Sequence, residues 1–404
     1  MWDLCDRLSR GGDYRLQGNR QEDRRKGATP MSKKELLKGN IAFAETAIRV
    51  GLQAYFGYPI TPQTEALEWM SKRMPELGRA FVQAESEVAA INMVYGAACT
   101  GVRVMTSSSS PGISLMMEGI SYIATTEVPV VIVDVMRGGP GLGNIAPSQA
   151  DYNQIVHGGG HGDYHLIVLA PASIQESIDM TVLAFDLAEK YRTLVVVLID
   201  GCLGQMMEPA VLPPMQPYKR KVHDWAVSGA KGREPHILNS FNLDPYDHEI
   251  VNLRLMNRWQ IIKKNEIRYK DYFIDDAKYA IIGFGTAGRI ALSAVRTARN
   301  MGIPIGLFRP ISLGPFPEEE VDSLCNQVEG LLVVEMNGGQ MLDDVLKICK
   351  GRIPVEFYGR PGGVVPVPDD ILPEIINLTQ NPTKDKTHPR DRWLERLTKE
   401  RGLS

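Results

Sequence analysis

The chain has 404 residues, of which 44% are hydrophobic, and a formal net charge of −3, so it is long enough for two packed cores and has the composition of a globular protein. This charge excludes the broad basic field with which proteins bind nucleic acid or anionic membranes. The five cysteines are far apart and form no Cys-x-x-Cys, which indicates a reducing compartment and argues against zinc or iron–sulfur sites in this chain. No apolar run is long enough to span a bilayer and the polar, acidic start is not that of a signal peptide, so we expect a cytoplasmic protein.

Residues 1–30 carry many charges and few hydrophobic side chains, which predicts a disordered extension. Over residues 31–213, helical patterns alternate with short apolar runs. This alternation predicts a parallel sheet with helices on both faces. Its strands are expected at residues 54–58, 80–84, 103–106, 128–136, 166–169 and 193–200.

A second α/β unit is predicted for residues 277–378, after a polar linker at 214–276. The linker carries apolar side chains at helical spacing, which indicates one long helix: Val251, Leu255, Trp259, Ile262, Tyr269 and Phe273. The strands of the second unit are expected at 278–284, 304–308, 330–335 and 355–358. Residues 379–404 have the composition of a charged tail, which we expect to dock only weakly through Trp393, Leu394 and Leu397.

Glu87 is the strongest candidate for a functional residue. It follows the apolar run at 80–84, and it precedes Val88, Ile91 and Val94 at helical spacing. A carboxylate is therefore predicted at the carboxyl edge of a parallel sheet, in the first turn of a helix, where open α/β folds bind ligands. The alternative is that Glu87 only complements the helix dipole.

Three further segments follow strands at the same predicted edge. Thr61 is expected either as a helix N-cap, with Pro62 at the first helical position, or as a hydroxyl that donates to a substrate oxygen. The serines at 107–110 form either a capped turn or part of a pocket wall. Arg137 precedes a glycine-rich stretch, and its guanidinium suits a carboxylate ligand, with a structural ion pair as the alternative.

Two patterns suggest other functions. Residues 283–288 form a Gly-x-Gly-x-x-Gly between a strand and a helix, which is the context of a dinucleotide site, yet the next strand ends in Phe308-Arg309 without an acid for a ribose. Nicotinamide binding is therefore kept only as an alternative of another class. His157, His161 and His165 are four residues apart, but the glycines between the first two disfavour a helix, so we expect a loop that contacts a partner rather than a metal site.

Six motifs in the same order make residues 36–378 resemble the alpha subunits of 2-oxoacid:ferredoxin oxidoreductases. They are Tyr58-Pro59-Ile60-Thr61-Pro62, Gln83-Ala84-Glu85-Ser86-Glu87, residues 106–112, Arg137-Gly138-Gly139-Pro140, Gly160-His161-Gly162-Asp163 and Glu335-Met336-Asn337-Gly338-Gly339-Gln340. Residues 81–96 and 158–164 are most similar to the branched-chain 2-oxoisovalerate enzymes. The resemblance implies a thiamine diphosphate-binding fold, with a pyrimidine-binding-type domain at 31–213 and a transketolase C-terminal-like α/β domain at 277–378.

The resemblance also implies roles for the candidate residues. Glu87 would bind the aminopyrimidine ring of thiamine diphosphate and drive the proton transfer that activates this cofactor. Ser108 and Ser109 would line the cofactor pocket, and Thr61 and Arg137 would bind the substrate carboxylate. The expected reaction is oxidative decarboxylation of a 2-oxoacid, 2-oxoisovalerate (3-methyl-2-oxobutanoate) before others, with coenzyme A to acyl-CoA, carbon dioxide and reduced ferredoxin.

The chain lacks the magnesium diphosphate motif of thiamine enzymes, because the nearest segment, Ile199-Asp200-Gly201-Cys202, has no Asn at the required spacing. The resemblance implies that it acts only with a beta subunit that holds Mg²⁺ and the diphosphate, a gamma subunit, and a ferredoxin-like delta subunit with iron–sulfur clusters. One alternative is the alpha subunit of a 2-oxoglutarate:ferredoxin oxidoreductase, which needs a further cation from Arg103, Arg289 or a partner. Another is a non-catalytic assembly subunit.

Overall fold

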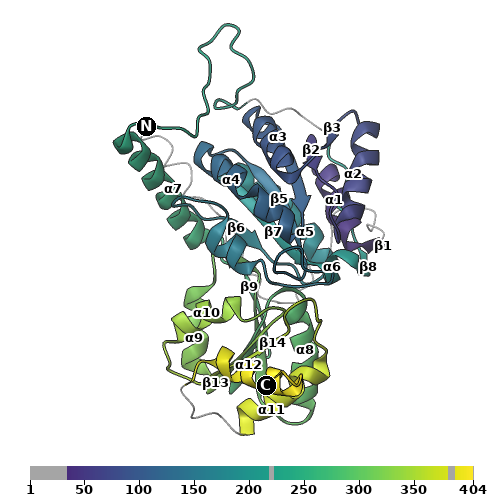
Figure 1. Cartoon of the computed structure of the whole chain (residues 1–404), viewed down its shortest axis with the longest axis vertical. Coiled ribbons are helices and arrows are strands. Elements are labelled where there is room, and N and C mark those ends of the chain that lie inside the picture. Colours follow the sequence, from purple (N-terminus) through teal and green to yellow (C-terminus); the bar gives the residue numbers. More distant parts are fainter. Residues whose placement is uncertain (1–33, 218–222, 381–386, 404) are drawn as a thin grey trace, which may run out of the picture. The chain divides into compact units, whose positions relative to one another are not determined.

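The computed structural model of the chain describes residues 34–217, 223–380 and 387–403, so the extension predicted at 1–30 lies outside the described residues. The first half contains β1 (Glu35–Lys38), α1 (Gly39–Arg49), β2 (Ala54–Gly57), α2 (Thr64–Glu76), β3 (Ala80–Gln83), α3 (Glu87–Cys99), β4 (Val104–Ser108), α4 (Ser110–Thr126), β5 (Val130–Met136), the π-helical turn η1 (Asn153–Gly158), β6 (Ile167–Leu169), α5 (Ile174–Tyr191), β7 (Leu194–Asp200), α6 (Gly201–Gln205) and β8 (Met207–Ala210) (Figure 1). The second half contains α7 (Pro245–Asn265), β9 (Tyr269–Tyr272), β10 (Tyr279–Ile282), α8 (Gly285–Asn300), β11 (Ile305–Pro310), β12 (Ser312–Gly314), α9 (Glu318–Gln327), β13 (Gly330–Glu335), α10 (Gln340–Cys349), β14 (Val355–Gly359), α11 (Pro368–Gln380) and α12 (Pro389–Glu400).

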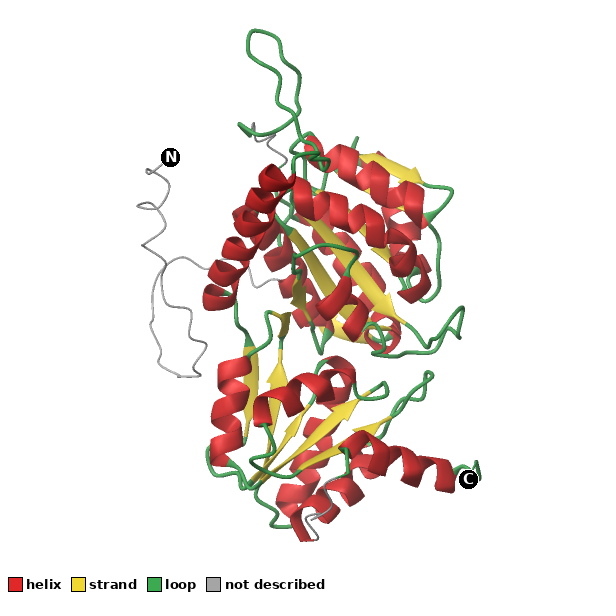
Figure 2. Cartoon of the chain, turned by 60° about the vertical axis from the view of Figure 1, so that its left-hand side comes forward, coloured by secondary structure: helices red, strands yellow, loops and turns green. Residues whose placement is uncertain are grey.

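The first sheet has the strand order β12-β6-β7-β5-β4-β2-β3, and it is parallel except for β12 at one edge. Both of its faces are buried, as strand β5 shows. Val130 and Ile132 belong to the apolar cluster that includes α3 and α4, whereas Val131 and Val133 belong to the cluster of α1, α2 and α5. Burial on both faces explains why these strands appear in the sequence as unbroken apolar runs. Figure 2 shows the strands between their helices.

The second sheet has the order β14-β13-β10-β11-β9, with β9 antiparallel at the edge. Helices α8 and α11 supply the apolar cluster of one face. The other face, with α9 and α10, joins the cluster of α3 and α4, so one core continues from the first sheet into the second. The rings of Tyr152 and Phe284 meet in it with their centroids 5.7 Å apart. Strand β12 strengthens this connection, because it follows β11 in the chain yet pairs with β6 of the first sheet.

Several local predictions were wrong or incomplete. The helix of the linker ends at Asn265, and Tyr269 lies in β9, where pairing with β11 replaces further helical turns. Thr61 is not an N-cap, because Ile60 and Gln63 close a turn and α2 begins only at Thr64. The antiparallel pair of β1 and β8 was not predicted.

The tail after residue 379 also differs from the prediction, since part of it is the packed helix α12. Trp393 is 5% exposed, its ring centroid lies 5.1 Å from that of Phe357, and its Nε1 donates to the Gly359 carbonyl at 3.1 Å. A buried indole with a satisfied N–H is a firm contact rather than weak docking. No helix among the described residues has the length and apolar character needed to cross a membrane.

Candidate active site

The site is built on the carboxyl edge of the first sheet, where Glu87 opens α3. Ser86 caps the helix, accepting a hydrogen bond from the Ala89 N–H at 3.1 Å, and this cap fixes where the first turn begins. Glu87 is only 4% exposed, whereas Glu85 two residues earlier is exposed. Burial distinguishes Glu87 from a surface glutamate that only complements the helix dipole.

Ser108, the last residue of β4, meets Glu87 beside Gly112 in the first turn of α4. A Cβ atom on Gly112 would lie 2.1 Å from Ser108 Oγ and 2.5 Å from Glu87 Oε1. Only a residue without a side chain fits between these two groups. The sequence showed the serine run but gave no reason to single out this glycine.

Three hydroxyls of this region are buried and have no hydrogen-bond partner among the described residues: Thr106 Oγ1, Ser108 Oγ and Ser109 Oγ. Buried polar groups in native structures are almost always paired. The Ser108 hydroxyl lies beside the buried Glu87 carboxyl group, and the other two belong to the same segment, so this set fits a polar ligand that supplies the missing hydrogen bonds. Ser107 lies on the opposite face of the strand, and its hydroxyl already has two hydrogen-bond partners, Tyr55 and Gln63, each at 2.7 Å.

Arg137 follows β5 and brings Thr61 into the same region. Its Nη1 donates to the Thr61 carbonyl at 2.8 Å and its Nη2 to the Leu142 carbonyl at 2.9 Å, while Nε is buried without a partner among the described residues. In the described part of the chain, no carboxylate lies within ion-pair distance of this guanidinium, so the structure does not support the alternative of a structural ion pair. Thr61 itself is exposed.

Behind Arg137 lies a buried pair of carboxyl groups that the sequence analysis missed. Asp134 in β5 is 0% exposed and Asp151 is 6% exposed, and the two side chains are within hydrogen-bonding reach of each other. Burial raises the pKa of Asp134 well above its usual range, and the neighbouring Asp151 raises it further. Burial also raises the pKa of Asp151, to about 6, although Ser110, Asp134 and the Arg137 charge each lower it. The feature of the sequence that could have revealed this pair is Asp134 itself, an aspartate inside the otherwise apolar strand β5.

The Gly-x-Gly-x-x-Gly of residues 283–288 does not form an open dinucleotide site. The Thr286 backbone N–H and hydroxyl donate to the buried Asp200 carboxylate at 3.3 Å and 2.8 Å, so a side chain from the first sheet occupies the N-terminus of α8. Arg309 is used similarly, since it forms an ion pair with Glu176 of α5 at 2.7 Å. These residues join the two halves of the chain.

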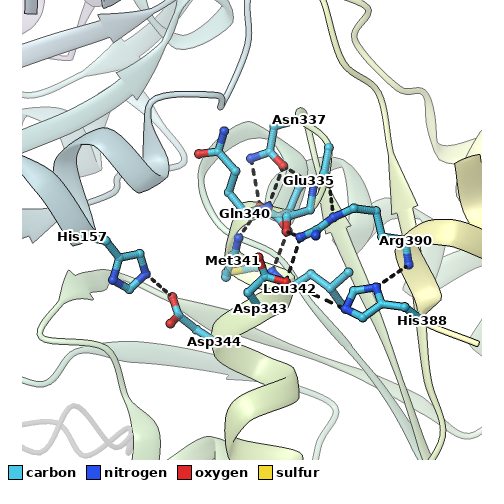
Figure 3. A network of polar contacts seen from close by, with 12 residues as sticks. His157, Glu335, Asn337, Gln340, Met341, Leu342, Asp343, Asp344, His388 and Arg390 are labelled. Atoms are coloured by element: carbon cyan, nitrogen blue, oxygen red, sulfur yellow. Dashed lines mark hydrogen bonds and ion pairs between the residues drawn. The ribbon is translucent and has the colours of Figure 1, made fainter. Parts of the chain in front are cut away.

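The histidine pattern does not build a metal site. His157 lies in η1, where a helical turn was not expected, and it contacts Asp344 of α10 at 2.9 Å (Figure 3). His165 instead stacks on Trp259. No group of three possible metal ligands occurs in the described residues.

Glu335 is the centre of the polar network in Figure 3. Its carboxyl group is fully buried and accepts hydrogen bonds from the Met341 and Leu342 N–H groups at the start of α10 and from Asn337, each at 2.9 Å. Burial dominates and raises its pKa to about 7. Asn337 also donates to the Gln149 carbonyl at 2.8 Å, which ties this network to the end of the loop that begins at Arg137.

Two family models match the chain. The thiamine diphosphate-binding domain of pyruvate flavodoxin/ferredoxin oxidoreductases matches residues 45–256, and core domain II of pyruvate:ferredoxin oxidoreductase matches residues 277–371. Ketoisovalerate oxidoreductase subunit VorB of Methanothermobacter marburgensis is 49% identical over 344 residues, which cover 85% of this chain and 97% of that protein. The 2-oxoglutarate synthase subunit KorA of the same organism is 37% identical over 375 residues, which cover 86% and 100%.

Solved structures show the same fold. The 2-oxoglutarate:ferredoxin oxidoreductase from Magnetococcus marinus, with 2-oxoglutarate, coenzyme A and succinyl-CoA bound, has a TM-score of 0.77 at 27% identity. The match covers 85% of this chain and 65% of that one. A split-gene transketolase, in an inactive beta4 tetramer, has a TM-score of 0.55 at 12% identity and shares the fold alone.

Proposed function

The chain belongs to the family of thiamine diphosphate-dependent 2-oxoacid:ferredoxin oxidoreductase subunits. We propose that Glu87 is the catalytic residue of this chain and that the substrate of the enzyme is 2-oxoisovalerate. The buried Glu87 carboxyl group beside unpartnered hydroxyls is the observation that carries this proposal. These groups fit the aminopyrimidine end of thiamine diphosphate, which offers ring nitrogens and an amino group to such partners. When bound, this cofactor supplies the carbon nucleophile that cleaves 2-oxoacids.

In this mechanism Glu87 holds and moves a proton at the aminopyrimidine ring nitrogen. Its position in the first turn of a capped helix fixes the carboxyl group, and its burial excludes water from the proton-transfer path. The hydroxyls of Ser108 and Ser109 supply hydrogen bonds that orient the ring, since neither has a partner among the described residues. Because Gly112 has no side chain, the Ser108 hydroxyl and the Glu87 carboxyl group can both approach the backbone of α4 at this point.

Arg137 and Thr61 are proposed to bind the substrate carboxylate. The guanidinium is held at two points by backbone carbonyls and keeps Nε free, so it is oriented before the substrate arrives. Thr61 is exposed, and its carbonyl is one of the two points that hold this guanidinium, which supports a role for its hydroxyl at the same substrate group.

The 2-oxoglutarate alternative requires a further cation for a second carboxylate. Arg103 stands before β4, at the amino edge of the sheet, and binds Glu189 at 2.5 Å. Arg289 binds Glu208 at 2.6 Å. Neither candidate from the sequence is therefore available at the site, which favours a substrate with an apolar chain, as the similarity to VorB also does.

The site is proposed to be completed by a partner subunit. Asp200 belongs to the segment that most resembles a magnesium motif, but its carboxyl group already accepts hydrogen bonds from Thr286 and from the Leu203 N–H. We therefore place Mg²⁺ and the diphosphate in a beta subunit, and the clusters that pass electrons to ferredoxin in a ferredoxin-like chain. Exposed apolar side chains flank the site and fit such an interface: Val82, Val88, Leu115, Leu142 and Ile145. The described cysteines are free thiols, which supports a cytoplasmic location.

The proposal is tested by Glu87→Gln in the reconstituted complex, with Glu85→Gln as the control. Both variants lose one carboxyl group, but only Glu87 is buried at the site. Turnover of 2-oxoisovalerate and hydrogen–deuterium exchange at the thiazolium carbon should fall by about a hundred- to ten-thousandfold in Glu87→Gln and remain near normal in Glu85→Gln. Near-normal exchange in Glu87→Gln would refute the assignment.

A further inference from the structure

The buried pair of Asp134 and Asp151 has no role in the mechanism above. Asp134 lies opposite Ser108 in the parallel register of β4 and β5, and it faces the apolar cluster of α3 and α4 rather than solvent. Neither of its carboxyl oxygens receives a hydrogen bond from a protein donor in the described residues. A buried carboxylate without a donor is very costly, so a proton between the two carboxyl groups is the simplest way to satisfy this geometry.

Asp151 connects this pair to the candidate substrate site through Ser110. The Ser110 hydroxyl donates to Asp151 Oδ2 and accepts the Arg137 backbone N–H at 3.0 Å. The Arg137 carbonyl is a second possible acceptor for this hydroxyl, at 3.3 Å, but a hydroxyl has a single proton to donate and a carboxylate is the stronger acceptor. Asp151 also stands at the far end of the loop that begins at Arg137, and its carbonyl accepts from the Ile155 N–H at 2.9 Å. The pair therefore holds the loop at both ends.

We propose that Asp134 and Asp151 share one proton at neutral pH and, through Ser110, position Arg137 for the substrate carboxylate. This inference rests on the proposed function, because it assumes that Arg137 binds the substrate. Both aspartates are positioning residues, since neither touches the reacting groups in the structure.

The charges around the pair make it sensitive to pH. Asp134 and Asp151 act on each other, and Arg137 is the charged group that stabilises ionised Asp151. The neighbouring strands contribute no charge, because β4 presents Ser108 and β7 presents Leu198 opposite Asp134. Helix α3 contributes Glu87, whose carboxyl group lies beside Ser108. Loss of the last proton at alkaline pH would leave two adjacent carboxylates, which repel each other and disturb the Ser110 contact.

The test measures kcat and KM for 2-oxoisovalerate between pH 6 and 9 in the reconstituted complex. Asp134→Asn retains a donor toward Asp151 and one negative charge, so KM at pH 7 should stay within about twofold of wild type while the alkaline rise in KM disappears. Asp151→Asn replaces the charged acceptor of Ser110, so KM should rise roughly tenfold across this range with kcat less affected. Glu45→Gln, which changes a buried carboxylate on the α1 face, should keep the wild-type pH profile.

Infrared difference spectroscopy on the isolated full-length chain tests the shared proton without any activity. At neutral pH, Glu335→Gln, which lacks the other buried carboxyl group with a pKa of about 7, should show a protonated carboxyl band that is lost when Asp134→Asn is added. The proposal is overturned if that band persists in the double variant, or if Asp134→Asn keeps the alkaline rise in KM. If the band is lost but Arg137→Ala leaves KM unchanged, the shared proton stands and the substrate role of Arg137 in the proposed function is wrong.

Discussion

The Ser108 hydroxyl and the Glu87 carboxyl group converge on one point, where a Cβ atom on Gly112 would lie 2.1 Å from one and 2.5 Å from the other. Ser108 ends β4 and Glu87 begins α3, so two elements that are separate in the chain deliver polar groups to the same volume. The glycine on α4 keeps that volume open. This arrangement depends on all three elements being in place.

We therefore expect Gly112→Ala to reduce turnover sharply. The added methyl group must displace Glu87 or Ser108, and a misplacement of about 1 Å at a reacting group costs roughly a hundredfold in rate. Gly96→Ala is the control, because Gly96 lies in the interior of α3 with no heavy atom within 4 Å of its added Cβ. That change should leave kcat unaltered and add about 0.5–1 kcal/mol of stability. Equal activity in both alanine variants would show that the space beside Gly112 is not used.

The parts of this candidate site that were proposed from the sequence are those that a strand end positions. Ser108 ends β4, whereas Ser109 and Arg137 directly follow β4 and β5. Glu87 begins the helix that comes after β3, and parallel strands bring their carboxyl ends to one edge. The function of Gly112 depends on distances to residues from two other elements, which no local pattern encodes.

Other features were missed because distant segments determine them. The short edge strands β9 and β12 form by pairing with β11 and β6, and their sequences carry no alternation of their own. In the sequence, Asp200 resembles part of a metal-binding motif, whereas in the structure its carboxyl group accepts a hydrogen bond from Thr286. Local spacing predicts such residues poorly, because their partners lie far away in the chain.

Arg137→Ala should weaken substrate binding more than it slows turnover of bound substrate. Loss of a hydrogen bond to a charged group costs about 1.5–3 kcal/mol, which corresponds to roughly a ten- to hundredfold rise in KM for 2-oxoisovalerate. Thiamine diphosphate binding should survive. Arg289→Ala, which removes an arginine already paired with Glu208, is the control and should leave KM for 2-oxoisovalerate and for 2-oxoglutarate unchanged. An unaltered KM in Arg137→Ala would mean that Arg137 does not bind substrate and serves only to hold the loop that it begins.

Thr286→Val should lower the free energy of unfolding of the chain. The valine removes the hydroxyl that donates to buried Asp200, at a cost of about 1–3 kcal/mol measured by urea unfolding. Thr297→Val, on the exposed face of the same helix, should stay within about 0.5 kcal/mol of wild type.

Equilibrium dialysis with NADH and NADPH should detect no binding to wild type, since Asp200 occupies the N-terminus of α8. Micromolar binding would restore the dinucleotide hypothesis.

Glu335 should make stability depend on pH in a direction opposite to that of an ordinary paired carboxylate. Its native pKa of about 7 lies above the unfolded value near 4.5, so the unfolded chain loses this proton first as pH rises. The contribution of Glu335 is therefore complete below about pH 4.5 and declines until pH passes 7, by roughly 3 kcal/mol if the whole shift is realised. Glu335→Gln does not titrate but keeps the shape of the side chain.

The measurement compares wild type with Glu335→Gln by urea unfolding at pH 5 and pH 8, so that all other titrating groups cancel in the difference. Wild type should be the more stable chain at pH 5, because Glu335 satisfies the Met341 and Leu342 N–H groups at the start of α10 and the amide has only one acceptor oxygen. That advantage should shrink at pH 8, where only wild type bears the cost of a buried charge. An advantage that grows at pH 8 would mean that the helix N–H groups outweigh burial and hold Glu335 ionised at neutral pH.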